Sequence, residues 1–279
     1  MFAWPKRMLM VRPHGFRVDY AINPYMLDEK GQLKKVDQAL AMRQWENLKR
    51  TFESLGQTVD VIEGDPEFPD MVFSANQTLP YFDREGRQRL LLARMHAEQR
   101  RGEVVHFRRW AEKHSIAYAS VEGVDFEGAG DAIWNYETRE LLAGVGPRSS
   151  IEGYQFLQTL TDVKLHVLKT VSQDFYHMDT SLAVLDAETV AYVPEAFASE
   201  SLAALKKVFK RHLLIDREEA KRAFAGNCVS VDGKNVVLHQ GATRFLKQLK
   251  ENGFTPIEVD VSEFLKSGGA VFCMKQRLY

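Results

Sequence analysis

Residues 228–238 read Cys-Val-Ser-Val-Asp-Gly-Lys-Asn-Val-Val-Leu. Two short runs rich in valine flank the Asp232-Gly233 pair, and an Asp-Gly pair in this setting predicts a two-residue β-hairpin turn. Outward from this hairpin, the apolar spacing predicts a helix over 242–252, which Asn252-Gly253 would end. Residues 255–259 then form a further expected strand. The stretch therefore predicts a unit of hairpin, helix and strand.

The same order of elements recurs along the 279 residues. Short apolar segments begin near Met71, Asp125, Tyr176, Asn227 and Gly269, and the first hairpin is expected between 70–73 and 78–82. Helices are expected over 36–55, 98–113, 151–160, 194–211 and 242–252, and closing strands over 57–62, 116–121, 164–168, 213–216 and 255–259. A period of roughly fifty residues indicates a repeat architecture and a single domain over 1–279. An ordinary α/β sheet, in which strands and helices also alternate, is the alternative.

Composition and charge restrict the class of protein. The 37 basic and 38 acidic residues leave a net charge of −1, which favours neither nucleic acid nor an anionic membrane as a partner. No apolar run approaches the ~20 residues that span a bilayer. The short apolar run 8–11 predicts a first strand rather than a secretory signal. Two cysteines outside any CxxC pair suit a reducing compartment, so we expect a cytoplasmic protein without a disulfide.

The thiol of Cys273 follows Gly268-Gly269 at the end of an apolar segment that we expect to be a strand. Paired glycines permit close approach of a ligand, which favours a nucleophile at this position. A buried structural cysteine is the alternative reading for Cys273, and the preferred one for Cys228 in its hairpin strand.

His177 has Asp179 two residues on, hence on the same face of an extended segment. A carboxylate beside an imidazole can fix its tautomer and raise its pKa, and the imidazolium can protonate a leaving amine. A structural histidine at a strand edge is the alternative. The histidines form no HxxH or HxxxH pair, so no metal site is expected.

Glu127 and Asp131 flank Gly128-Ala129-Gly130. Carboxylates accept paired hydrogen bonds from a planar guanidinium, whereas Asp131 and the glycine spacing argue against a phosphate loop. Asn76 and Asn23 offer amides to a polar ligand. Ordinary turn chemistry explains all four residues equally well.

Taken together, these motifs resemble the amidinotransferase (guanidine-modifying, pentein) superfamily. The resemblance rests on segments that occur in order along nearly the whole chain: 16–24, 69–76, Arg100-Arg101-Gly102-Glu103, 126–131, 177–180, and Gly268-Gly269 with Cys273. The superfamily includes arginine deiminases, dimethylarginine dimethylaminohydrolases and arginine dihydrolases. The implied fold is a five-bladed α/β propeller with pseudo-five-fold repeats.

The resemblance also implies roles for individual residues. Cys273 would be the nucleophile, His177 the general acid and base, and Glu127 the carboxylate that binds the guanidinium. Asp179 would orient His177 or hold the substrate, and Asp131 joins it among the expected substrate-binding residues. Arg100 and Arg148 are two candidates for binding the substrate carboxylate.

Two departures indicate a particular branch of the superfamily. Deiminases and dimethylarginine hydrolases usually have an aspartate at the position of Asn76, and their glutamate stands three rather than four residues before the aspartate of the glycine motif. Arginine dihydrolases are similar to this chain, with asparagines that match Asn23 and Asn76. An amide accommodates the neutral ureido group of citrulline better than a buried unpaired anion would.

We therefore expect a hydrolase that converts arginine to ornithine, ammonia and carbon dioxide through a thiouronium intermediate, with no metal or organic cofactor. Its partner would be a small guanidino compound, and the sequence does not decide whether the protein forms a homo-oligomer. A dimethylarginine hydrolase or an arginine deiminase that yields citrulline is the first alternative. A non-catalytic binding protein of the same fold is the second.

Overall fold

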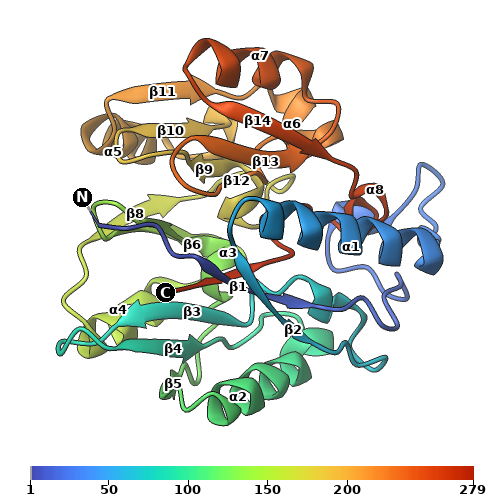
Figure 1. Cartoon of the computed structure of the whole chain (residues 1–279), viewed down its shortest axis with the longest axis horizontal. Helices are drawn as coiled ribbons and strands as arrows, with labels where there is room; N and C mark the ends of the chain where they lie inside the picture. The colour runs from blue at the N-terminus through green and yellow to red at the C-terminus, as the bar shows by residue number, and fades with distance from the viewer. Residues whose placement is uncertain (1) are drawn as a thin grey trace.

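The computed structural model describes residues 2–279, which contain five three-stranded β-sheets (Figure 1). In each sheet, the middle strand is antiparallel to one neighbour and parallel to the other. In spatial order, the sheets are β15 (Gln276–Leu278), β1 (Arg7–Val11), β2 (Thr58–Ile62); β3 (Thr78–Phe82), β4 (Gln88–Leu92), β5 (Tyr118–Ser120); β6 (Ala132–Asn135), β7 (Glu140–Val145), β8 (Leu165–Lys169); β9 (Leu182–Val184), β10 (Thr189–Tyr192), β11 (Arg211–Leu214); and β12 (Val229–Ser230), β13 (Asn235–His239), β14 (Thr255–Val259). The predicted α/β architecture of five repeated units is confirmed.

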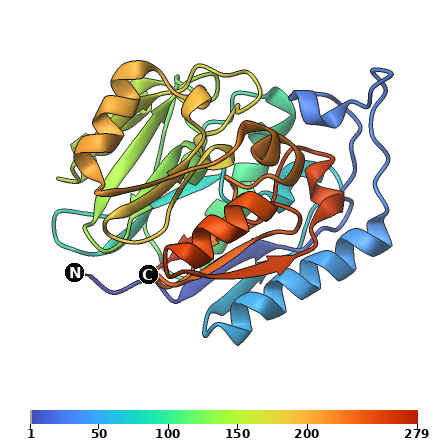
Figure 2. The ribbon, with the colours of Figure 1, turned by 90° about the horizontal axis from the view of Figure 1, so that it is seen from above.

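A helix connects the two parallel strands of every sheet, because parallel strands need a long crossover. These helices are α1 (Gln38–Ser54), α2 (Val104–Lys113), α4 (Ile151–Leu160), α5 (Ser199–Val208) and α7 (Thr243–Glu251). Figure 2 shows α1 and α5 at opposite edges of the molecule with strands between them. In α1, Asp37 caps the first turn by accepting a hydrogen bond from the Leu40 N–H. Trp45, Leu48 and Phe52 are buried at helical spacing.

The unit that begins near Gly269 is completed by residues from the other end of the sequence. Its strand β15 pairs antiparallel with β1, so that Arg7 lies opposite Leu278. The predicted strand at residues 8–11 is thus the middle strand of this sheet. Within residues 2–279, no helix is long and apolar enough to cross a membrane.

Three local predictions are wrong. Residues 70–73 do not form a strand: Pro69–Val72 is a 3₁₀ helix (η2), which proline favours at its first position, and β3 pairs with β4 instead. Cys273 lies in a turn that precedes β15, not in a strand. The hairpin at Asp232-Gly233 has a three-residue loop, because the Val231 N–H donates to the Asn235 carbonyl.

Several helices differ in extent from the prediction. Residues 98–113 begin as a 3₁₀ helix, η3 (Glu98–Glu103), and residues 194–211 divide into η5 (Pro194–Ala196), α5 and β11. The prediction missed α6 (Arg217–Ala223), although Asp216 caps it and acidic residues fill its first turn. The remaining short helices are η1 (Pro24–Met26), α3 (Gly128–Asp131), η4 (Met178–Thr180) and α8 (Ser262–Leu265).

The repeat brings polar residues to the same end of all five sheets. Each sheet has one strand that enters from this end, and a buried polar residue or the thiol stands just before it. These residues are Asn76 before β3, Asp131 before β6, Asp179 before β9, Asn227 before β12 and Cys273 before β15. Apolar side chains of β3, β6, β9 and β12 lie in the main core, and Leu278 of β15 lies in a second cluster. The fold therefore gathers the candidate site where five chain segments enter their sheets.

Candidate active site

Cys273 is held in its turn by a side chain that the sequence did not single out. Asn227 Oδ1 accepts hydrogen bonds from the backbone N–H groups of Ala270, Phe272 and Cys273 at 3.0–3.2 Å. Its Nδ2 donates to Cys273 Sγ at 3.1 Å and to the Asp179 carbonyl at 3.0 Å. Asn227 is fully buried, and only its place before an expected first strand hinted at this role. One amide thus fixes both the turn and the sulfur.

The thiol lies against the carboxylate of Asp179. Cys273 Sγ donates to Asp179 Oδ2 at 3.1 Å, while Oδ1 is buried and has no hydrogen-bond partner within the described residues. Burial raises the pKa of Asp179 to about 6. Burial and the adjacent Asp179 raise the pKa of the Cys273 thiol well above its usual range. The resting pair therefore holds a proton between sulfur and oxygen.

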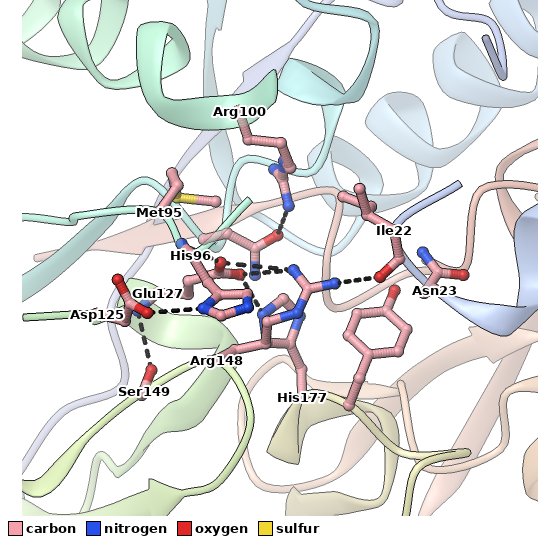
Figure 3. Close-up of polar contacts among 12 residues, drawn as sticks. Ile22, Asn23, Met95, His96, Arg100, Asp125, Glu127, Arg148, Ser149 and His177 are labelled. Carbon is pink, nitrogen blue, oxygen red and sulfur yellow. Dashed lines mark hydrogen bonds and ion pairs between the residues drawn. The ribbon is translucent and has the colours of Figure 1, made fainter. Parts of the chain in front are cut away.

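His177 pairs with Glu127, which lies fifty residues earlier in the sequence (Figure 3). Nε2 of the imidazole lies 2.5 Å from Glu127 Oε2, and both side chains are buried. Burial alone would raise the pKa of Glu127, but the charge and hydrogen bond of His177, with Arg148 and Arg100, lower it to about 2. The expected pairing of Asp179 with His177 assumed an extended segment, whereas residues 178–180 form η4 and Asp179 contacts the thiol.

Asp131 lies behind the site rather than in the pocket. Its Oδ1 accepts from the Met178 N–H at 2.9 Å, and its Oδ2 accepts from Ser149 Oγ at 2.7 Å. Gly130 needs to be a glycine, because a Cβ there would overlap Asn76 Nδ2. Asp131 therefore supports the segment that carries His177, and it does not line the pocket that contains Cys273.

The two candidate arginines both line the thiol pocket. Arg100 pairs with Glu103 at 2.9 Å and donates to Asn76 Oδ1 at 3.0 Å. Arg148 donates to Glu127 at 3.3–3.4 Å and to the Ile22 carbonyl at 2.8 Å. Both guanidinium groups are almost fully buried. Their charges offset the buried carboxylates of the site.

Asn76 and Asn23 both line the pocket but have different partners. Asn76 Oδ1 is occupied by Arg100, while its Nδ2 is buried and without a partner in residues 2–279. Asn23 Nδ2 donates to the Ser267 carbonyl at 2.9 Å, and its Oδ1 caps η1 through the Tyr25 N–H. Asn76 therefore has a free donor inside the site, whereas Asn23 attaches its own segment to the body of the protein.

The pocket itself is closed. It has a volume of about 10 Å³, room for roughly one water molecule, and Cys273 is 2% exposed. A larger outer cavity of about 430 Å³ lies next to it and shares four lining residues with it: Ile22, Asn23, Arg148 and Tyr176. Tyr176 OH donates to the Gly268 carbonyl at 2.5 Å, and Gly268 has a φ of +90° that glycine tolerates. These four residues separate the thiol from the outer cavity.

The geometry agrees with the comparisons with known proteins. A sequence profile for N,N dimethylarginine dimethylhydrolases of eukaryotic type matches residues 12–279. The chain belongs to this family. It is 36% identical to the N(G),N(G)-dimethylarginine dimethylaminohydrolase of Mycobacterium tuberculosis, over 96% of this chain and 84% of that protein.

A second relative is the bifunctional arginine dihydrolase/ornithine cyclodeaminase ArgZ of a Synechocystis strain. It is 32% identical over 98% of this chain, which spans only 37% of the length of ArgZ. The crystal structure of the N-terminal domain of ArgZ, an arginine dihydrolase, as a cysteine-to-serine mutant bound to substrate, is similar with a TM-score of 0.90. That match has 31% identity and covers 97% of both chains. The pentein fold predicted from the sequence is therefore confirmed.

Proposed function

We propose that this protein hydrolyses guanidino compounds and, specifically, that it is an arginine dihydrolase that releases ornithine, two ammonia molecules and carbon dioxide. The observation that carries this proposal is the amide of Asn76 in a pocket with Cys273. Its Oδ1 is held by Arg100, so its Nδ2 is left to donate. A guanidinium has no acceptor for this donor, whereas the ureido oxygen of citrulline does. The site thus suits the intermediate on which a second hydrolytic cycle acts.

The side chains can perform each step of the first cycle. The thiol proton passes to Asp179, to which Sγ is already hydrogen-bonded, and sulfur adds to the guanidinium carbon. His177, which is hydrogen-bonded to Glu127, protonates the nitrogen that leaves as ammonia. Water then adds to the thiouronium carbon, the carbon–sulfur bond breaks, and citrulline and the free thiol result.

The second cycle repeats this chemistry on the ureido group. Sulfur adds to the ureido carbon and ammonia leaves, so that a thiocarbamate forms. A second water molecule releases the carbamate of ornithine, which loses carbon dioxide. Two waters are consumed for each arginine. Arg148 contacts Glu127 in the closed site. The guanidinium of an incoming substrate would replace Arg148 at Glu127, and Arg148 would then be free to bind the substrate carboxylate.

Product analysis tests the proposal. The protein is incubated with arginine, methylarginines, agmatine and citrulline, and the products are identified by mass. Ornithine from both arginine and citrulline is expected, and a Cys273→Ala variant should form none. Citrulline as the end product would refute the second cycle. Turnover by the Cys273→Ala variant would refute the thiol mechanism altogether.

Exchange of one atom in the pocket separates the two cycles. In an Asn76→Asp variant, a carboxylate replaces the free donor and would repel the ureido oxygen. We expect the ratio of citrulline to ornithine formed from arginine to rise at least tenfold, because the second cycle slows more than the first. An Asn252→Asp variant is the matched control, since it makes the same exchange at an exposed residue at the end of α7. An unchanged ratio in Asn76→Asp would contradict the assigned role of the amide.

A dimethylarginine hydrolase is the second candidate function, and the match to that family profile favours it. It predicts citrulline and dimethylamine from dimethylarginine as the preferred reaction. Both cysteines are free and buried, which supports a reducing, cytoplasmic location. A single catalytic domain over 1–279 and association into a homo-oligomer stay predictions.

A further inference from the structure

A second small cavity lies on the other side of the turn that carries the thiol. Its volume is about 20 Å³, and its walls include Trp4, Cys228, Phe272, Lys275 and Arg277. Among residues 2–279, it shares no lining residue with the pocket that contains Cys273. The turn therefore has the thiol on one side and a lysine on the other.

Lys275 is a buried cation without a paired carboxylate. It is 1% exposed, and the ion pairs of the described residues do not include it. Its Nζ lies 3.2 Å from the centroid of the Phe272 ring. Burial, followed by repulsion from Arg277, lowers the pKa of Lys275 to about 7. An ammonium in such a place is costly unless a nearby anion offsets it.

The anionic group that acts on Lys275 is the pair formed by Cys273 and Asp179. Attraction to Asp179 and to Cys273 acts to raise the pKa of Lys275, and Lys275 in turn acts to lower the pKa of Asp179. Asp179 Oδ1 has no hydrogen-bond partner in the described chain, so its charge is only partly offset by local contacts. The unpaired ammonium and the partly satisfied carboxylate thus complement each other.

The other charged and titratable groups around these three side chains come from separate elements: Tyr136 and Arg277 near the cavity, and Arg100, Arg148, Tyr176, His177 and Asp131 near the thiol. Arg100 already pairs with Glu103, and both Arg148 and His177, whose charge acts most strongly on Asp179, pair with Glu127. Arg277 donates to backbone carbonyls of residues 230 and 231. Lys275 is therefore the cation of this group that is left to act on the thiol and its carboxylate.

We propose that Lys275 is a positioning residue: its ammonium stabilises the negative charge shared by Cys273 and Asp179 from the side of the turn away from the substrate. The inference rests on the proposed role of Cys273 as nucleophile. The pair shares one proton and so carries one negative charge, on sulfur or on oxygen, and a buried anion without a cation is costly. A cation behind the turn offsets this cost without occupying the substrate pocket.

Alkylation of the thiol tests the inference without turnover. The rate at which iodoacetamide modifies Cys273 is measured against pH, by the mass of the Cys273 peptide, in wild type and in Lys275→Met. We expect the midpoint near pH 6, where the pair loses its first proton while Lys275 is still charged, to rise by about one unit in the variant, so that alkylation at pH 5 slows about tenfold. An unchanged midpoint, even with lower turnover, would mean a merely structural role and would overturn the inference.

Two further measurements complete the test. Cys228→Ala changes the same cavity without removing charge, so its midpoint should stay that of wild type; a shift as large as that of Lys275→Met would overturn the inference. If Lys275→Met does not fold, the titration of Lys275 Nζ is followed by NMR in wild type and Asp179→Asn. Reciprocity requires a lower Lys275 pKa in Asp179→Asn, and an unchanged value would overturn the inference. A wild-type protein that is alkylated normally but forms no product would contradict the proposed function alone.

Discussion

Glu127 and Asp179 are both fully buried carboxylates, yet their environments shift their pKa values in opposite directions. Glu127 has a hydrogen bond and charge attraction from His177 and contacts Arg148, which together lower its pKa to about 2 despite burial. Asp179 accepts from a weakly donating thiol and has one oxygen without a partner in residues 2–279, so burial raises its pKa to about 6. At neutral pH, one carboxylate stabilises the fold and the other strains it.

The two carboxylates should therefore respond oppositely to neutralisation. Asp179 binds its proton more tightly in the folded state, so its ionisation costs stability progressively as pH rises from about 4 through 6. We expect Asp179→Asn to increase the free energy of unfolding by up to about 3 kcal/mol at pH 7 and by much less at pH 4. Glu127 contributes stability above its unfolded pKa of 4.5, which is lost as pH falls towards 2. Glu127→Gln should therefore cost about 3 kcal/mol at pH 7.

Urea denaturation at pH 4 and pH 7 measures both effects on the same protein. Both variants should also lose activity. Because Asp179→Asn would lose activity while gaining stability, its loss of function could not be attributed to unfolding. A change of the same sign for the two variants at pH 7 would contradict the environments described for them.

At the scale of the elements, apolar periodicity predicted the long helices and strands well, whereas the short turns and 3₁₀ helices were not predicted. The helix α1 and the strand β14 follow from apolar spacing alone, and both were predicted to within two residues. Residues 70–73 have the apolar character of a strand, but Pro69 begins a 3₁₀ helix. Its backbone groups bond within the helix, as the Phe73 N–H does to the Asp70 carbonyl. Several candidate site residues were found as polar side chains beside predicted apolar segments, and Cys273 was expected at the end of such a segment rather than before a strand. The partners of these residues were not found, since the contact of His177 with Glu127 depends on how two sheets meet, which no local spacing reveals.

We expect the segment over residues 20–34 to be the element that moves when a substrate enters. Figure 1 shows it projecting from the body beside α1. Side-chain hydrogen bonds to the Ile22 carbonyl and from Asn23 attach it at the pocket, and much of 27–33 is exposed. Few buried contacts imply a low local free energy of opening. The volume of the closed pocket, about 10 Å³, requires such opening before arginine can enter.

Hydrogen exchange should detect this opening. In Cys273→Ala, which should bind arginine without turnover, amides over 20–26 are expected to exchange at least several-fold more slowly when arginine is present. The reason is that a bound ligand adds contacts that exist only in the closed form. The turn at 83–87 joins β3 to β4 at their far ends and serves as the control, with no change expected. Equal exchange over 20–26 with and without arginine would show that the ligand enters by another route.

At the scale of the whole molecule, the site depends on contacts between sheets as much as on the sheets themselves. Asn227, Asp179 and Cys273 precede strands of three different sheets and are joined by hydrogen bonds. Apolar packing alone would not fix these segments to within a hydrogen-bond length. Buried polar side chains that bridge sheets therefore hold the geometry of the site.

Gln276 is the bridge whose loss can be measured most cleanly. Its Nε2 donates to the carbonyls of Ala75 and Thr78, which joins β15 to the segment that carries Asn76. Gln276→Leu roughly keeps the volume but removes the donor to the buried Thr78 carbonyl, while the Ala75 carbonyl keeps its bond from the Ala129 N–H. We expect a loss of about 1–3 kcal/mol, a thermal midpoint lower by roughly 2–10 °C, and reduced kcat. Gln57→Leu is the matched control, because Gln57 Oε1 has no partner in residues 2–279, and it should be near neutral in both stability and activity. Equal thermal midpoints for the two variants would show that the bridge does not hold the sheets together.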